Sequence, residues 1–260
     1  GGKSSGPFSS LNLGFSTGDD DDLVEENYGL FAQALSIPPE GIAFSRQVHG
    51  KNCVLVTAKT DLDELSVVPA DALITRDPGV FVCVRTADCY PILVVDPQER
   101  WIAAVHAGWR GTLEGVLRET IQTMKEKLGV VPRDLRVAIG PGISLGSFEV
   151  SSGVAALFRG SPGLKPSEIV EKEASSYIDL EAINVRQAVE CGVDPANVWK
   201  SGCCTVKDAK RFYSYRRDGK AHEGLGLGAL DVGVRDRRAQ ERGRDRCADR
   251  PSKGTRENPR

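Results

Sequence analysis

Two short apolar runs, residues 92–95 and 101–105, constrain the fold more than any other part of the chain. Both have the composition of β-strands, and a polar turn at residues 96–100 separates them. This pattern predicts two antiparallel strands joined by a short connection. Cys89 precedes the first run and His106 follows the second, so strand pairing would bring a thiol and an imidazole close together. We therefore expect the functional site at this hairpin.

A second imidazole belongs to a compact polar motif upstream, at residues 46–50. The chain has three histidines, and two of them, His49 and His106, lie beside glycine or alanine in such motifs. Together with Cys89 they are the first candidates for metal ligands or catalytic groups.

Composition and charge exclude several classes of function. A chain of 260 residues can bury a substantial core, and 40% hydrophobic with 27% charged residues is ordinary for a soluble globular protein. A net charge of −2 gives no overall positive potential that would attract nucleic acid or an anionic membrane. No apolar run approaches the roughly 18 residues of a membrane span, and the first residues do not resemble a secretory signal. Seven cysteines without a CxxC pair favour a reducing cytoplasm and argue against a zinc finger.

Strand and helix patterns alternate along the chain, with several strand pairs on short turns. The pattern predicts a layered α/β fold of the α+β kind, in which helices cover mixed β-sheets within a single domain. Strands are expected at residues 41–48, 53–57, 71–75, 135–139, 197–200 and 211–218, the first two as neighbours. Helices are expected at residues 23–35, 112–128, 151–158 and 179–191. Residues 1–22 and 160–176 are expected to be surface loops.

The clearest helix is the one expected at residues 112–128, where apolar residues recur at three- and four-residue steps. Gly129 suits the left-handed position that ends a helix. This helix would begin directly after residues 108–111, so its first backbone N–H groups and Arg110 form a candidate anion site.

Two imidazoles and one thiolate suit a zinc ion and leave a fourth tetrahedral position open, as catalytic zinc sites do. Zinc lowers the pKa of a bound water to about 7, which gives a nucleophile at neutral pH. The spacing of His49, Cys89 and His106 alone also permits two loop histidines and a buried thiol without a metal.

A rival chemistry needs no metal. Cys89 could be a nucleophile activated by His106, with Asp88 or Asp71 orienting the imidazole, as in a cysteine hydrolase or deamidase. Copper is the alternative metal for a phenol oxidase, but a blue-copper centre usually adds an axial methionine. The single methionine, Met124, belongs to the apolar face of a helix, so copper chemistry is the weaker hypothesis.

Seven motifs resemble one known family in the same order along the chain. They lie at residues 6–14, 46–50, 71–75, 86–91, 105–111, 140–143 and 213–218. The chain resembles the YfiH family, long described as multicopper polyphenol oxidoreductase laccases and now as purine nucleoside phosphorylases. The resemblance covers about residues 1–219, which are expected to form the catalytic domain. It implies zinc at His49, Cys89 and His106, phosphorolysis of adenosine, inosine and 5′-methylthioadenosine, and deamination of adenosine.

The reactions that the resemblance implies assign roles to further residues. Arg46 is the first candidate for binding phosphate, with Arg110 and the pair Arg216 and Arg217 as weaker candidates. Asp88, next to a ligand, is a candidate for moving protons or for fixing its loop.

Two neutral side chains, Asn12 and Gln47, are candidates for binding sugar hydroxyls or base edges, with turn stabilisation as the alternative. The expected partners are thus a purine nucleoside and phosphate, and the oligomeric state is left open. Residues 220–260 depart from the family pattern and are expected to be a disordered, Arg-rich tail.

Overall fold

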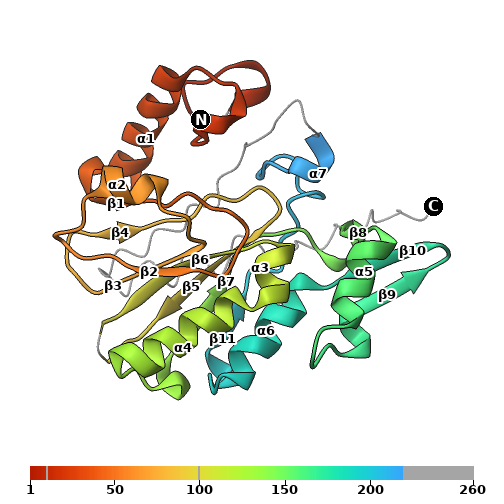
Figure 1. Cartoon of the computed structure of the whole chain (residues 1–260). Coiled ribbons are helices and arrows are strands. Elements are labelled where there is room, and N and C mark those ends of the chain that lie inside the picture. The colour runs from red at the N-terminus through yellow and green to blue at the C-terminus, as the bar shows by residue number, and fades with distance from the viewer. Residues whose placement is uncertain (10, 99, 219–260) are drawn as a thin grey trace, which may run out of the picture.

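The predicted hairpin forms the centre of a six-stranded sheet (Figure 1). In the computed structural model, which describes residues 1–9, 11–98 and 100–218, β5 (Tyr90–Val95) and β6 (Ile102–Ala107) pair antiparallel. The strand order is β11 (Val198–Lys200), β7 (Arg136–Ile139), β5, β6, β3 (Ala72–Thr75) and β2 (Cys53–Leu55). The outer pairs are parallel and the inner pairs antiparallel, which confirms the mixed α/β fold.

The two faces of this sheet bury different layers because side chains alternate along each strand. One face, with Ile74, Ile92 and Val105, packs against α4 (Val116–Leu128) and α6 (Leu180–Glu190). The other face, with Leu73 and Leu93, packs against a second apolar cluster that includes α2 (Leu62–Val67). Strands covered on both faces read as continuous apolar runs, as β5 does.

The predicted long helix is two helices, and this part of the prediction was wrong. α3 (Trp109–Glu114) ends at Gly115, which has a φ of 83°, and α4 follows directly. Glycine adopts this left-handed conformation without steric cost, so the chain can change direction there. The predicted end of the helix is confirmed, since Gly129 has a φ of 71°.

Two smaller sheets flank the central one. β1 (Ile42–Ala43) pairs with β4 (Phe81–Val82), while β10 (Ser175–Ile178) lies between β8 (Glu149–Val150) and β9 (Ile169–Lys172). The expected pairing of residues 41–48 with 53–57 was wrong, because the chain leaves the extended conformation at His49, where φ is 61°. The loop expected at residues 160–176 contains β9 and the start of β10, which pair as a hairpin.

The ends of the described chain meet over the sheet (Figure 1). α1 (Asp21–Leu35) confirms the first predicted helix, and α5 (Ser152–Arg159) and α6 confirm two more. The strand expected at residues 211–218 was wrong, since α7 (Tyr215–Asp218) is helical. Tyr213 donates a hydrogen bond to the carbonyl of Phe8 (3.1 Å), so the C-terminal segment returns to the N-terminal one.

The predicted tail at residues 220–260 lies outside the described residues. Among the residues that are described, no helix combines the length and the apolar character that a membrane crossing requires.

Candidate active site

Three side chains from separate segments converge at one end of the central sheet. The ligand atoms of His49, Cys89 and His106 all lie within 4.8 Å of one another, and the two imidazole rings meet edge to face at 4.8 Å between centroids. Cys89 and His106 come together because β5 and β6 pair with Pro91 opposite His106. His49 reaches them from the segment between β1 and β2. The predicted grouping of these three residues therefore exists in the structure.

Asp71, at the start of β3, fixes two of these segments at once. Its carboxylate is fully buried and lies 2.7 Å from Nδ1 of His106. It also accepts hydrogen bonds from the backbone N–H groups of Val48 (3.2 Å), His49 (2.9 Å) and Gly50 (2.8 Å). A proton on Nδ1 of His106 leaves its Nε2 lone pair for a metal, and such carboxylate partners orient ligating histidines in many metal sites.

The charges of the metal-free site follow from this arrangement. Burial disfavours the thiolate of Cys89, but the imidazoles of His106 and His49 outweigh it and lower the pKa of Cys89 to about 6. Burial likewise disfavours the imidazolium of His106, but Cys89 and then Asp71 raise the pKa of His106 to about 9. Despite its burial, the hydrogen bond from His106 holds the pKa of Asp71 below its usual range. The site without metal therefore holds a thiolate and an imidazolium at neutral pH.

The start of α3 packs closely on Cys89 and on the segment that carries His49. A Cβ atom at Gly108 would lie 2.8 Å from Cδ2 of His49 and 2.9 Å from Sγ of Cys89. A Cβ atom at Gly111 would lie 2.8 Å from the carbonyl oxygen of Gly50. Because no side chain fits in these contacts, glycine at both positions lets α3 approach the ligands closely.

A cavity of about 890 Å³ opens beside the three ligands. Four further residues predicted for the site line it, namely Arg46, Gln47, Asp88 and Arg110. Asn12 is not among its lining residues. The amide of Asn12 is buried and bonds within the N-terminal turn, accepting from Gly14 N (3.0 Å) and donating to Thr17 Oγ1 (3.0 Å).

The hydrogen bonds of Asp88 connect the cavity to the C-terminal segment. Its carboxylate accepts from the Thr205 hydroxyl (2.6 Å) and from the backbone N–H of Arg216 (2.7 Å). Asp88 has a φ of 86°, a conformation that non-glycine residues rarely adopt. The carboxylate next to Cys89 therefore holds the segment that carries α7.

The guanidinium groups at the cavity are arranged differently from one another. Arg46 donates from Nε to the Val67 carbonyl (3.3 Å), and Arg110 lies over the ring of Trp109 at 4.5 Å. Arg216 lines the cavity, whereas Arg217 does not; its guanidinium bonds Asp218 and the carbonyls of nearby residues.

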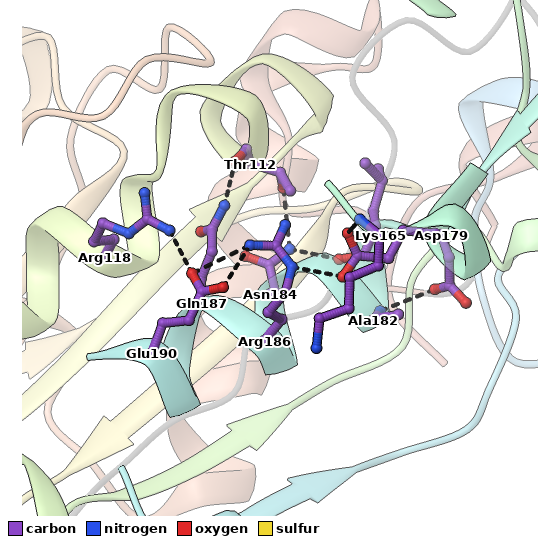
Figure 2. A network of polar contacts seen from close by, with 11 residues as sticks. Thr112, Arg118, Lys165, Asp179, Ala182, Asn184, Arg186, Gln187 and Glu190 are labelled. Atoms are coloured by element: carbon purple, nitrogen blue, oxygen red, sulfur yellow. Dashed lines mark hydrogen bonds and ion pairs between the residues drawn. The ribbon is translucent and has the colours of Figure 1, made fainter. Parts of the chain in front are cut away.

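Figure 2 shows how α6 supports α3 from behind. Asn184 donates to the Thr112 hydroxyl (3.0 Å), and Gln187, one turn later, donates to the Thr112 carbonyl (2.8 Å). α6 itself is held by Arg186, which bonds Glu168 (2.6 Å) and Glu190 (3.0 Å). Because α3 has six residues and no side-chain cap, these amides give it a support that it lacks on its own.

Comparisons with known proteins agree with the motif resemblance. A family model described as multi-copper polyphenol oxidoreductase laccase matches residues 1–230. The chain belongs to this family. A protein of Deinococcus radiodurans named purine nucleoside phosphorylase is 38% identical to this chain over 218 residues, covering 84% of this chain and 81% of that protein. One of Bacteroides thetaiotaomicron is 36% identical over 226 residues, covering 84% of each.

Solved structures extend the comparison to the fold. YlmD from Geobacillus stearothermophilus superimposes with a TM-score of 0.81 at 34% identity, covering 89% of this chain and 87% of that chain. The Bacillus licheniformis protein YfiH gives a TM-score of 0.80 at 27% identity, covering 84% of each chain. The resemblance to the YfiH family and its mixed α/β fold are thus confirmed.

The donor set of this laccase-family chain fits a metal ion. His49, Cys89 and His106 supply two nitrogens and one sulfur, and Asp71 supplies the orienting carboxylate. Met124 is fully buried in the apolar core on α4, so it is no axial ligand for a blue-copper centre.

The cavity residues that the sequence analysis did not name as candidates include Phe15, Arg85 and Tyr215. Phe15 follows one motif directly, Arg85 precedes another, and Tyr215 lies inside a third. The signal available was therefore position next to a motif, since their residue types alone indicate no chemistry.

Proposed function

We propose that this protein is a zinc-dependent purine nucleoside phosphorylase that also deaminates adenosine. Adenosine, inosine and 5′-methylthioadenosine would react with phosphate to give the free base and the ribose 1-phosphate, a transferase reaction, while deamination to inosine is a hydrolase reaction. One observation carries the proposal. Two imidazoles and a thiol converge beside a cavity lined by arginines, in a chain whose relatives are named purine nucleoside phosphorylases.

His49, Cys89 and His106 would hold the zinc ion, with Asp71 fixing the ring of His106. When bound, zinc would supply a Lewis acid and lower the pKa of water toward neutrality. The thiolate of Cys89 is already favoured without metal, because its pKa is about 6, so binding costs little deprotonation at neutral pH.

Phosphorolysis requires cations that hold phosphate near the anomeric carbon, where positive charge develops as the base leaves. Arg46 and Arg110 are the proposed phosphate ligands. Neither forms an ion pair within the described part of the chain, and both line the cavity. An arginine without an acidic partner keeps its donors for an anion. Arg85 meets the same conditions and is the third candidate.

Asp88 is the proposed group for moving protons during deamination. It lines the cavity next to Cys89, and the Thr205 hydroxyl and the Arg216 N–H fix the orientation of its carboxylate. Gln47 has both ends of its amide bonded to the backbone of Arg85 (2.7 and 2.8 Å), so we assign it to joining the segments of Arg46 and Arg85. Asn12 receives the role of stabilising its turn.

The test is the turnover of adenosine by zinc-loaded and metal-stripped protein, with and without phosphate, and with the products identified. Ribose 1-phosphate should form only with phosphate, and inosine should form without it. Arg46→Ala should raise the KM for phosphate, while Arg133→Ala, an exposed arginine outside the cavity, should not. Equal turnover with and without zinc would contradict the metal dependence, and base release without phosphate would contradict phosphorolysis.

A cysteine hydrolase is the second candidate, because Cys89, His106 and Asp71 are aligned as a nucleophile, a base and an orienting acid. The two histidines separate the candidates. A hydrolase would lose activity in His106→Ala but keep it in His49→Ala and without metal, whereas the zinc enzyme needs both histidines. The free thiols of Cys53 and Cys191 fit the proposed cytoplasmic location.

A further inference from the structure

One aromatic ring in the cavity is both open and supported from behind. Phe15 lines the cavity and is 43% exposed. Its ring stacks on that of Tyr28 with 5.7 Å between centroids and 11° between planes. A ring that stacks on one face leaves its other face for a flat ligand.

The support of Phe15 continues into the body of the protein. Tyr28 lies on α1 and contacts Phe44 edge to face at 5.3 Å, and Arg85 lies over the ring of Phe44 at 5.1 Å. The Tyr28 hydroxyl donates to the carbonyl of Leu13 (2.7 Å), two residues before Phe15. These contacts fix Tyr28, and therefore the plane on which Phe15 rests.

The backbone that carries Phe15 is also fixed. Asn12 accepts the N–H of Gly14 (3.0 Å), and the Thr17 hydroxyl donates to the carbonyl of Gly14 (2.8 Å), so both sides of the turn are bonded. An exposed ring held in one orientation loses little conformational entropy when a ligand stacks on it.

The other aromatic rings of the cavity are less available. Arg110 covers the ring of Trp109, and Phe148 is 7% exposed with Arg216 over it at 5.5 Å. Tyr215 is exposed, but no ring lies behind it within the described residues. Phe15 is therefore the open ring with the best-defined orientation.

We propose that Phe15 is the stacking surface for the purine base, and that it determines the preference for purine over pyrimidine nucleosides. This inference rests on the proposed function, because it takes the cavity to be the nucleoside site. A purine presents a larger flat surface than a pyrimidine, so an aromatic platform favours it. The ribose and phosphate would then lie toward the arginines and the three ligands.

The experiment measures steady-state turnover for zinc-loaded wild type, Phe15→Leu and Phe15→Tyr, and adenosine binding by calorimetry for the same three proteins stripped of zinc, so that adenosine is not converted during the titration. Removing one stacking ring should raise the Kd and the KM for adenosine roughly ten-fold, with kcat little changed. Phe15→Tyr keeps the ring and should restore wild-type values. In the reverse reaction the KM for ribose 1-phosphate should be unchanged, because that substrate carries no base.

Trp199→Leu is the matched control, since Trp199 is 47% exposed on β11 but does not line the cavity. It should leave binding and turnover unchanged, and equal thermal unfolding of the two leucine variants would show that both are folded. An unchanged Kd in Phe15→Leu, or an equal rise in the KM for ribose 1-phosphate, would overturn the stacking role.

The same measurements separate this inference from the proposed function. Turnover that is independent of Phe15 overturns the inference alone. Phe15-dependent adenosine binding without any turnover overturns the proposed function alone. If wild type neither binds nor converts adenosine, both are overturned.

Discussion

Replacing Asp71 with asparagine should weaken the metal site without touching a ligand. The carboxylate accepts hydrogen bonds from three backbone N–H groups at Val48, His49 and Gly50, and it lies beside Nδ1 of His106. Asparagine keeps one oxygen and places an NH₂ group where an acceptor stood. At least one buried donor must then lose its partner.

The hydrogen bonds of Asp71 determine how much stability the substitution should remove. A hydrogen bond to a charged group contributes about 1.5–3 kcal/mol, and an unsatisfied buried donor costs about 1–3 kcal/mol. We therefore expect Asp71→Asn to lower the free energy of unfolding of the metal-free protein by about 3 kcal/mol. Zinc affinity should fall by roughly 10–100-fold, as for other carboxylates that orient a ligating histidine.

Two assays measure these losses separately. Urea unfolding of metal-stripped protein gives the stability, and competition with a chromophoric chelator gives the zinc affinity. Asp77→Asn is the matched control, because Asp77 also accepts a backbone N–H, that of Ala58 (2.8 Å), but bonds no histidine among the described residues. If Asp71→Asn lost stability but kept wild-type zinc affinity, the orienting role of Asp71 would be refuted.

Three further results are expected. Gly108→Ala should abolish zinc binding, measured by metal analysis of purified protein, because its Cβ would lie within 3 Å of His49 and Cys89. Gln187→Leu should raise the KM for nucleoside with a smaller effect on zinc affinity, since it releases α3 at Thr112. Gln122→Leu at an exposed position of α4 serves as its control. In metal-free protein, alkylation of Cys89 should follow a thiolate pKa of about 6. The thiolate's stabilisation is present above the unfolded pKa of 9.0 and is lost as pH falls through about 6, while that of the His106 imidazolium is present below 6.5 and is lost as pH rises through about 9. Between about pH 6.5 and 9 the folded pair and the unfolded chain each bind one proton at these two groups, so the two contributions cancel. Urea unfolding of the metal-free protein should therefore show little pH dependence from them in this range, and a steep slope there would contradict the paired shifts.

The sequence predicted the parts of the fold that local patterns determine. The hairpin of β5 and β6 and the helix α6 follow from apolar periodicity and turn residues. The break between α3 and α4 was missed because a single glycine inside an apolar period can also continue a helix. The left-handed φ of 83° at Gly115, which ends α3, is a tertiary feature that the apolar period does not show.

The three side chains that converge at the site were predictable from the sequence, but the contacts that hold them in place were not. Rare residue types in compact motifs pointed to His49, Cys89 and His106. The sequence offered Asp71 or Asp88 as the acid that orients His106 and could not choose between them, because only the tertiary fold brings His106 and the backbone N–H groups of residues 48–50 to Asp71. Phe15 was missed because its orientation depends on stacking against Tyr28, which no local sequence pattern shows.

Because the two ends of the described chain meet at the cavity, the sheet can form before the wall of the cavity is complete during synthesis. Phe15 from one end and Arg216 from the other line the same cavity, and Tyr213 bonds Phe8 across 205 positions of sequence. On the ribosome the sheet can assemble once its strands have emerged, but the pocket wall waits for the last of these residues. A nascent chain therefore lacks the complete pocket wall until residue 216 has emerged, and a product that stalls earlier would carry His49, Cys89 and His106 without that wall.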